Sequence, residues 1–348
     1  MSERPGRGSG GVVVIVSIDT EEDNWRPSRS GVTLENIGEL RPLAEFFRRL
    51  GVRPTYFTAY RVAIDSRAAD ALQDACDRGG GEIAAHLHPW NTPPLLQALV
   101  PRNSMLKNLP ADLQLAKIER LTAALEETFG FPPRAFRAGR YGLGRDTVGA
   151  LLRCGYRVDS SVCPFISWED FDDGPNFVGA PLAPYHLAPD RDVTQPAPSG
   201  PLVEIPLSFG FSRRPFSFWE PVRRLLDVAP LRWFRLAGLA ARTGVVKRVA
   251  LSPELASVAD MLTLSRQLLE LGVPHLQLSW HTPSLKPGLS PFAATAADVA
   301  RLYASVDAYL DGLARFTRVT FATISEAAAL LCGDSATLEP HASATGVR

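Results

Sequence analysis

The sequence predicts an α/β fold in which helices cover a parallel sheet, and we expect the sheet to close into a barrel. Three observations lead to this prediction. Short apolar runs alternate with amphipathic segments along most of the chain, which is typical of repeated strand–helix units. Around seven or eight such units are present, enough to close a sheet. Polar residues follow the apolar runs, as they do where functional groups gather at the carboxyl ends of parallel strands.

The first half of the chain contains the clearest elements. Residues 12–18 form a continuous, largely β-branched run, which predicts a buried strand. Residues 34–50 carry apolar side chains at helical spacing, and Gly51 is a helix stop. The same alternation continues after this unit. We expect strands at 53–58, 82–85 and 135–137, and helices at 65–78, 112–129 and 145–154.

The second half is less regular. Proline is frequent up to Pro201, so we interpret residues 163–260 as an irregular insertion with long loops. Ends rich in small and polar residues predict disordered tails at 1–10 and 334–348, and therefore a single domain over 11–333. The remaining elements follow the alternation seen in the first half. We expect strands at 156–162, 202–207, 276–279 and 319–323, and helices at 294–316 and from Ser325.

The composition excludes several classes of function. The chain has 37 basic and 37 acidic residues, whereas a dedicated nucleic-acid binder needs a basic surplus. No apolar window reaches the ~18 residues of a membrane span, and the polar N-terminus followed by a short apolar run does not fit a secretory signal. The four cysteines include no Cys-x-x-Cys pair, which argues against a zinc ribbon or a disulfide framework. We therefore expect a cytoplasmic protein.

One segment, residues 213–248, is strongly basic. It holds nine Arg and Lys residues against Glu220 and Asp227, with aromatic residues interleaved. Two interpretations stay open. The segment is either a solvated helical face, or a surface that contacts an anionic membrane or a lipid-linked, phosphate-bearing glycan. The second interpretation would make the protein membrane-associated.

The first predicted strand runs into an acidic cluster. Asp19, Glu21, Glu22 and Asp23 place four carboxylates within five positions, where they repel one another. A bound cation is the simplest physical reason to gather them, although a solvated acidic loop is the alternative. Asp19 and Glu21 are two residues apart, so they point the same way in an extended chain. This spacing makes the pair a candidate metal-binding or catalytic group.

A second group follows the third predicted strand. His86 and His88 are also two residues apart, so both imidazoles can face one point. Two histidines and one carboxylate are a common ligand set for a catalytic divalent metal that keeps positions open for water. Since strand ends of one barrel converge, the histidines and the acidic cluster together predict a metal site.

Three later strands also end in polar residues. Arg137 is either a surface salt-bridge residue or a cation that keeps Asp19 ionised and oriented. Asp159 is a candidate for orienting a histidine. His281, just past the strand at 276–279, is a candidate general acid.

Five segments of the chain together form a recognisable set of motifs. In chain order, SIDTEED, EIAAHLHPWNTPP, FRAGRYG, VDSSV and LSWHTPS resemble the motifs of the polysaccharide deacetylase superfamily, also called the NodB-homology carbohydrate esterases. They are most similar to the WalW-like branch, which is associated with bacterial surface-polysaccharide gene clusters. The resemblance implies a distorted (β/α) barrel of about seven units and removal of an N-acetyl or other acyl group from an amino sugar. It also implies a divalent metal, usually zinc, with cobalt, manganese, nickel and iron as alternatives.

The resemblance also implies roles for individual residues. Asp19 falls on the general base, and Arg137 on the arginine that orients it. His281 falls on the general acid, and Asp159 on the aspartate that tunes that acid. The remaining positions concern the metal and the substrate. His86 falls on the first metal histidine, and the backbone N–H of Tyr141 on the donor to the oxyanion.

The chain departs from the family pattern at two positions. Thr20 stands where the family has a second aspartate, so we expect Glu21 to replace it as a metal ligand, with Asp23 in reserve. Trp90 stands where the family has its second metal histidine, so His88 must serve instead.

Three functions are compatible with the sequence. The first is deacetylation of a carbohydrate, free or lipid-linked, from a bacterial surface polysaccharide or its precursor. The second is hydrolysis of another small C–N amide on the same scaffold, and the third is non-catalytic carbohydrate binding. Trp25 and Trp90 lie beside two of the motifs, where they either stack on sugar rings or pack at the barrel mouth.

Overall fold

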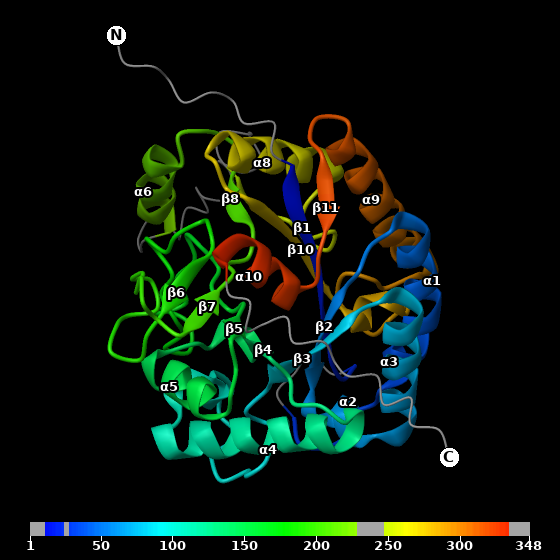
Figure 1. Ribbon diagram of the computed structural model, residues 1–348, viewed down its shortest axis with the longest axis vertical. Helices are drawn as coiled ribbons and strands as arrows, with labels where there is room; N and C mark the ends of the chain where they lie inside the picture. The colour runs from blue at the N-terminus through cyan, green and yellow to red at the C-terminus, as the bar shows by residue number, and fades with distance from the viewer. Residues whose placement is uncertain (1–10, 24–27, 228–246, 334–348) are drawn as a thin grey trace.

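The computed structural model describes residues 11–23, 28–227 and 247–333 (Figure 1). Several sequence predictions lie outside these residues: the disordered tails at 1–10 and 334–348, the role of Trp25, and the part of the basic segment at 228–246. Two basic residues in the described parts of this segment form ion pairs with acidic residues of α8 (Val258–Glu270). Arg214 pairs with Glu270, and Lys247 pairs with Asp260 at 2.6 Å.

The predicted parallel α/β sheet is confirmed. One nine-stranded sheet has the order β10-β1-β2-β3-β4-β5-β7-β6, and β11 also pairs with β1. Its neighbouring strands are parallel except for β6 and β7, which are antiparallel. The strands are β1 (Val12–Thr20), β2 (Thr55–Ala59), β3 (Glu82–Leu87), β4 (Ala135–Ala138), β5 (Val158–Asp159), β6 (Tyr185–Leu187), β7 (Leu202–Glu204), β10 (His275–His281) and β11 (Val319–Phe321).

The sheet curls into the distorted barrel that the sequence predicted, but the described residues show no ladder between β7 and β10. Individual hydrogen bonds cross this gap instead. His275 Nε2 donates to the Pro206 carbonyl at 2.9 Å, and the Gln277 N–H donates to Ser208 Oγ at 2.9 Å. A separate antiparallel pair, β8 (Phe209–Phe211) and β9 (Arg248–Ala250), lies here too, and Ser279 N–H donates to the Leu251 carbonyl just after β9 at 3.0 Å.

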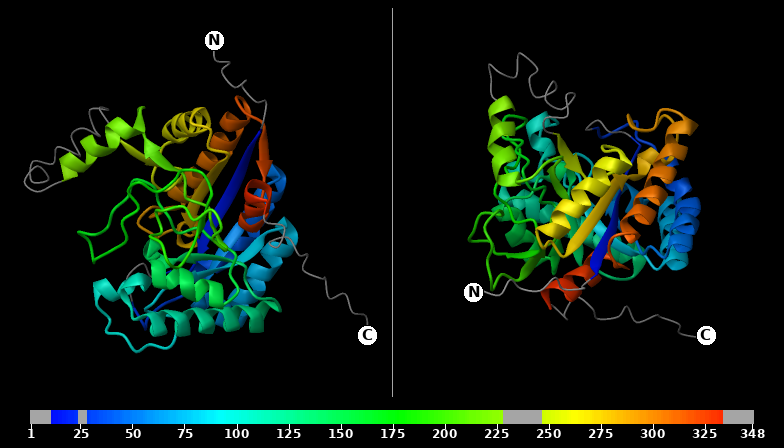
Figure 2. Two further views of the ribbon diagram at one scale, coloured as in Figure 1. Left: turned by 60° about the vertical axis from the view of Figure 1, so that its left-hand side comes forward. Right: turned by 90° about the horizontal axis from the view of Figure 1, so that it is seen from above.

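Helices cover the outside of the sheet (Figures 1 and 2). Figure 1 shows α1 and α3 together on one side and α4 along another. Their apolar faces and the outward side chains of the strands form the larger core cluster. The covering helices are α1 (Leu40–Leu50), α2 (Tyr60–Ile64), α3 (Ser66–Gly79), α4 (Ala111–Phe129), α5 (Arg145–Arg153), α8 (Val258–Glu270) and α9 (Ala296–Ala314), whereas α6 (Phe216–Asp227) lies against β8.

Helix α10 (Ile324–Cys332) closes the amino-terminal end of the barrel. Its Ala327 and Ala328 pack against inward side chains of the strands, among them Ile15 and Phe57. The start of α10 also donates backbone hydrogen bonds to Thr55 Oγ1 at 2.8 Å and to Glu82 Oε2 at 3.0 Å. The polar side chains Asp19, His86 and His281 lie at the opposite, carboxyl end.

The sequence predictions miss some element boundaries. The strand expected at 156–162 is reduced to β5, because the Asp159 carboxylate accepts hydrogen bonds from Ser161 N and Oγ and turns the chain. The helix expected at 34–50 begins as a 3₁₀ helix, Glu35–Glu39, before α1. Among its described residues, the irregular insertion holds four short strands, β6 to β9, and α6, and α8 begins at its end. None of the helices among the described residues has the length and apolarity needed to cross a bilayer.

Candidate active site

The four carboxylates of the acidic cluster have four different environments. Asp19 pairs with Arg137, whereas Glu21 lies between His86 and His88. Glu22 accepts a hydrogen bond from the Asn91 side chain. The Asp23 carboxylate accepts the Glu35 N–H at 2.7 Å and so caps the 3₁₀ helix. Asp19 and Glu21 therefore line the site. Asp23, which the sequence predicted as a reserve metal ligand, caps the 3₁₀ helix instead.

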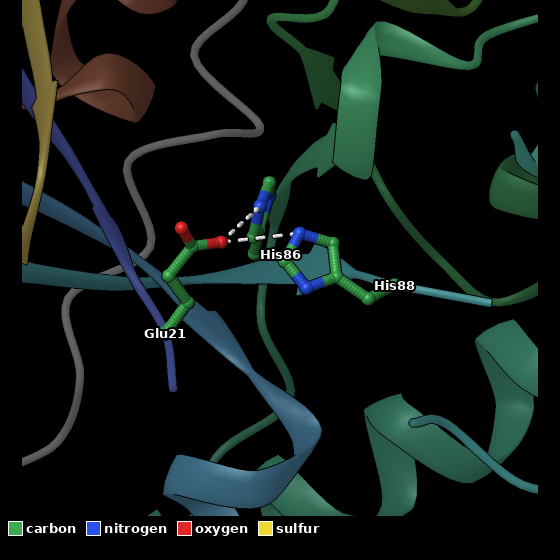
Figure 3. Close-up of side chains that lie close together, drawn as sticks. All are labelled: Glu21, His86 and His88. Carbon is green, nitrogen blue, oxygen red and sulfur yellow. Dashed lines mark ion pairs between the residues drawn. The ribbon is translucent and has the colours of Figure 1, made fainter. Parts of the chain in front are cut away.

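Glu21, His86 and His88 converge at the carboxyl ends of β1 and β3 (Figure 3). Glu21 Oε2 lies 3.1 Å from His88 Nε2 and 3.5 Å from His86 Nε2. The three side chains are buried, and their ligand atoms all lie within 4.8 Å of one another. A carboxylate and two imidazoles at this spacing fit the donor set of a catalytic zinc or iron(II) site.

Electrostatic interactions within this group shift the pKa values of Glu21 and His88. Burial alone would raise the pKa of Glu21, but the facing His88 and His86 imidazoles hold it well below its usual value. Burial likewise opposes the charged form of His88, yet the Glu21 and Glu22 carboxylates raise its pKa to about 10. Because a metal binds the neutral imidazole, metal binding at this site must release the His88 proton.

The backbone positions both histidines. Strand alternation puts His86 and His88 on the inner side, and His86 Nδ1 donates to the Arg137 carbonyl at 3.1 Å, which turns Nε2 toward Glu21. Gly139 leaves room for the second ring, because a Cβ at this position would lie 2.0 Å from His88 Cδ2. Trp90 stacks on His88 with ring centroids 4.2 Å apart. Thr20 takes no part, since its hydroxyl donates to the Ile18 carbonyl.

Arg137 is fully buried inside the barrel, which rules out a surface salt bridge. Its Nη1 donates to Asp19 Oδ1 at 2.6 Å, and its other nitrogens donate to Ser17 and Ser160. Its guanidinium also lies over the Phe57 ring at 4.0 Å. Burial would raise the pKa of Asp19, but Arg137, helped by His86 and His281, lowers it. Asp19 is therefore held as an oriented carboxylate.

His281 is the last residue of β10 and lies opposite Asp19 in the sheet register. Its Nε2 is 3.8 Å from Asp19 Oδ2, and its Nδ1 bonds to Glu254 Oε2 at 2.8 Å. Burial would lower the pKa of His281, but Glu254 above all raises it to about 9. The imidazole is therefore protonated at neutral pH and can act as a proton donor.

The prediction that Asp159 orients a histidine is wrong. The Asp159 carboxylate bonds to Ser161 and faces Glu204 across the β5–β7 pair, and burial raises the pKa of both acids. Glu254 occupies the orienting position instead. Glu254 lies in the irregular insertion and belongs to none of the motifs, although the apolar run at 249–251 before it is a strand-like signal.

The floor of an open cavity of about 700 Å³ is formed by Asp19, Glu21, His86, His88, Glu254 and His281. Trp90 and Tyr141 line its walls, and Tyr141 stacks on Trp168 with centroids 5.4 Å apart. Arg140 and Tyr141 both have positive φ values, 52° and 57°. Such backbone strain is concentrated at functional sites. The Arg140 guanidinium holds this turn to the cavity wall through Asp172 at 2.9 Å and through Ser104.

Comparison with solved structures shows that this chain has a known fold. A candidate polysaccharide deacetylase from Mycobacterium smegmatis is 19% identical, with 95% of this chain and 93% of that chain covered and a TM-score of 0.51. A candidate glycoside hydrolase/deacetylase from Parabacteroides distasonis is 14% identical, with coverages of 93% and 71% and a TM-score of 0.59. The chain has the polysaccharide deacetylase fold.

Within the deacetylase fold, the finer assignment to the WalW-like branch stays a prediction. No model of a known protein family matches the chain, and no curated protein matches it. The cavity floor lies at the carboxyl ends of β1, β3 and β10.

Proposed function

We propose that this protein is a metal-dependent hydrolase that removes an N-acyl group, acetyl in the simplest case, from an amino sugar. The observation that carries this proposal is the buried Glu21–His86–His88 group beside an ionised Asp19 and a protonated His281. The sequence motifs support a substrate from a bacterial surface polysaccharide or its precursor.

The residues divide the chemistry between them. Glu21, His86 and His88 would hold the divalent metal, with zinc favoured by the donor set and cobalt, manganese, nickel and iron as alternatives. When bound, such a metal polarises the acyl carbonyl and lowers the pKa of water. Asp19, kept ionised by Arg137, accepts the proton of the attacking water. His281 donates its proton to the leaving nitrogen, and the Tyr141 N–H donates to the oxyanion.

The open cavity bears on the competing functions. A hydrolase of a small cyclic amide needs a closed pocket, whereas this cavity of about 700 Å³ has several exposed side chains at its mouth. A purely carbohydrate-binding protein needs neither a proton acceptor nor a proton donor, yet here Asp19 lies 3.8 Å from His281 and 3.9 Å from His86. These observations favour an enzyme that acts on a substituted sugar.

The metal site provides the first test. Purified protein supplemented with zinc and then desalted should retain about one equivalent and release acetate from N-acetylated amino-sugar oligomers. Replacing His88 with alanine should lower metal affinity by about tenfold or more, because one of three ligands is lost. Glu45→Gln, at an exposed carboxylate of α1, is the matched control. Wild-type protein that retains no metal would contradict the proposal and favour the binding protein.

The pH profile tests the role of Glu254. Because this carboxylate raises the pKa of His281 to about 9, wild-type kcat/KM should fall as pH rises through about 9. In Glu254→Gln the His281 pKa should fall, moving this alkaline limb to lower pH by about one unit or more. Glu270→Gln, at an exposed acid on α8, should leave the limb unchanged. A uniform loss of activity without a moved limb would show that Glu254 is only structural.

A further inference from the structure

The mouth of the cavity is surrounded by exposed apolar side chains. We call Leu99, Val100, Phe171, Leu255 and Phe292 the apolar rim; each lines the cavity, and they are 37–58% exposed. Ten large apolar side chains are exposed among the residues that the structure describes, and half of them belong to this rim. Single exposed apolar residues are ordinary, but a concentration at the mouth of one cavity marks a binding surface.

The walls below the rim are also largely apolar. Trp90, Pro101, Met105 and Trp168 line them. The charged wall residues Arg140 and Asp172 are bonded to each other at 2.9 Å, and Arg140 also bonds to Ser104. These walls therefore offer few uncommitted charged groups to sugar hydroxyls, whereas the floor is rich in carboxylates and imidazoles.

We propose that the substrate is an amphiphile whose amino sugar reaches the floor while an aliphatic chain attached to it lies against the apolar rim. This rests on the proposed function. Aromatic walls alone would also suit stacked sugar rings. Leu99, Val100 and Leu255 add aliphatic surface, and covering this surface with alkyl carbon removes apolar area of both from water. The chain is attached either through the acyl group or through the glycosidic oxygen.

Two substrate series locate the chain. One series is alkyl β-glycosides of N-acetylglucosamine with alkyl chains of 1 to about 12 carbons, and the other is methyl glycosides with N-acyl chains of 2 to about 12 carbons. Zinc-loaded protein is assayed below the micellar concentration. In one series kcat/KM should rise about fourfold for each methylene that the rim covers completely. If kcat/KM rises with length in the glycoside series, the aliphatic chain of the substrate is attached through the glycosidic oxygen. If kcat/KM rises with length in the acyl series, the aliphatic chain is attached through the nitrogen.

The same assays distinguish failure of this inference from failure of the proposed function. If the methyl glycoside is hydrolysed and both series are flat, the inference is overturned and the hydrolase stands. If nothing is hydrolysed, calorimetric titration with the same two series decides the inference, because chain-length-dependent binding supports it and equal affinities overturn it.

Variants of the rim give an independent test. Phe171→Ser and Leu99→Ser change exposed side chains, so both proteins should fold. Each should reduce the ratio of kcat/KM for the favoured decyl substrate to that for its shortest homologue by about tenfold. The matched control is Leu330→Ser, at a 61% exposed residue of α10 at the closed end of the barrel, which should keep the wild-type ratio. Equal ratios in all four proteins would contradict the assignment of the chain to this rim.

Discussion

Replacing Asp19 with asparagine should lower the rate of acetate release by at least about 100-fold. The amide has nearly the shape of the carboxylate and still accepts a hydrogen bond from Arg137, but it cannot take a proton from water. Because Glu21, His86 and His88 are unchanged, the variant should retain its metal. The measurements are acetate release at saturating substrate, metal content, and the thermal unfolding midpoint.

The control for this variant is Asp70→Asn, at an exposed acid of α3. It should behave as the wild type in all three measurements. His281→Ala should show a loss as large as that of Asp19→Asn, because the leaving nitrogen then lacks its proton donor. A D19N rate within tenfold of the wild type would remove Asp19 from the role of general base.

Replacing Arg137 with methionine should lower the free energy of unfolding by about 3–5 kcal/mol, since it leaves the buried Asp19 carboxylate without its cation. In the wild type the lowered Asp19 pKa adds stability above the usual aspartate pKa, and this contribution is lost as pH falls through the lowered value. Denaturant unfolding at neutral pH measures the difference.

Two further variants isolate this ion pair. Adding Asp19→Asn to Arg137→Met removes the unpaired charge, so the double variant should regain part of the lost stability. Arg53→Met breaks the partly exposed pair with Glu326 and should cost about 1 kcal/mol or less. If the Arg137 variant were no less stable than the Arg53 variant, the buried pair would not be a structural element of the barrel.

Much of the fold was predictable because its signals are local. The run at 12–18 matches β1, and the helices expected at 65–78, 112–129 and 145–154 match α3, α4 and α5 to within a residue or two. Boundaries failed where side chains override the pattern. At β5 the Asp159 carboxylate turns the chain, and before α1 the Asp23 cap starts a 3₁₀ helix.

The candidate site shows the same division. Spacing by two residues determined that Asp19 shares a side with Glu21, and His86 with His88, because side chains alternate along an extended chain. Spacing could not tell that Glu254 bonds to His281 while Asp159 faces Glu204. Those pairs join separate elements, and so do the side chains of the apolar rim. The sequence by itself thus determined, for each of these side chains, on which side of its strand the side chain lies. Only the tertiary structure decided which groups meet, because strand order and the packing of the covering helices set the neighbours of each strand end.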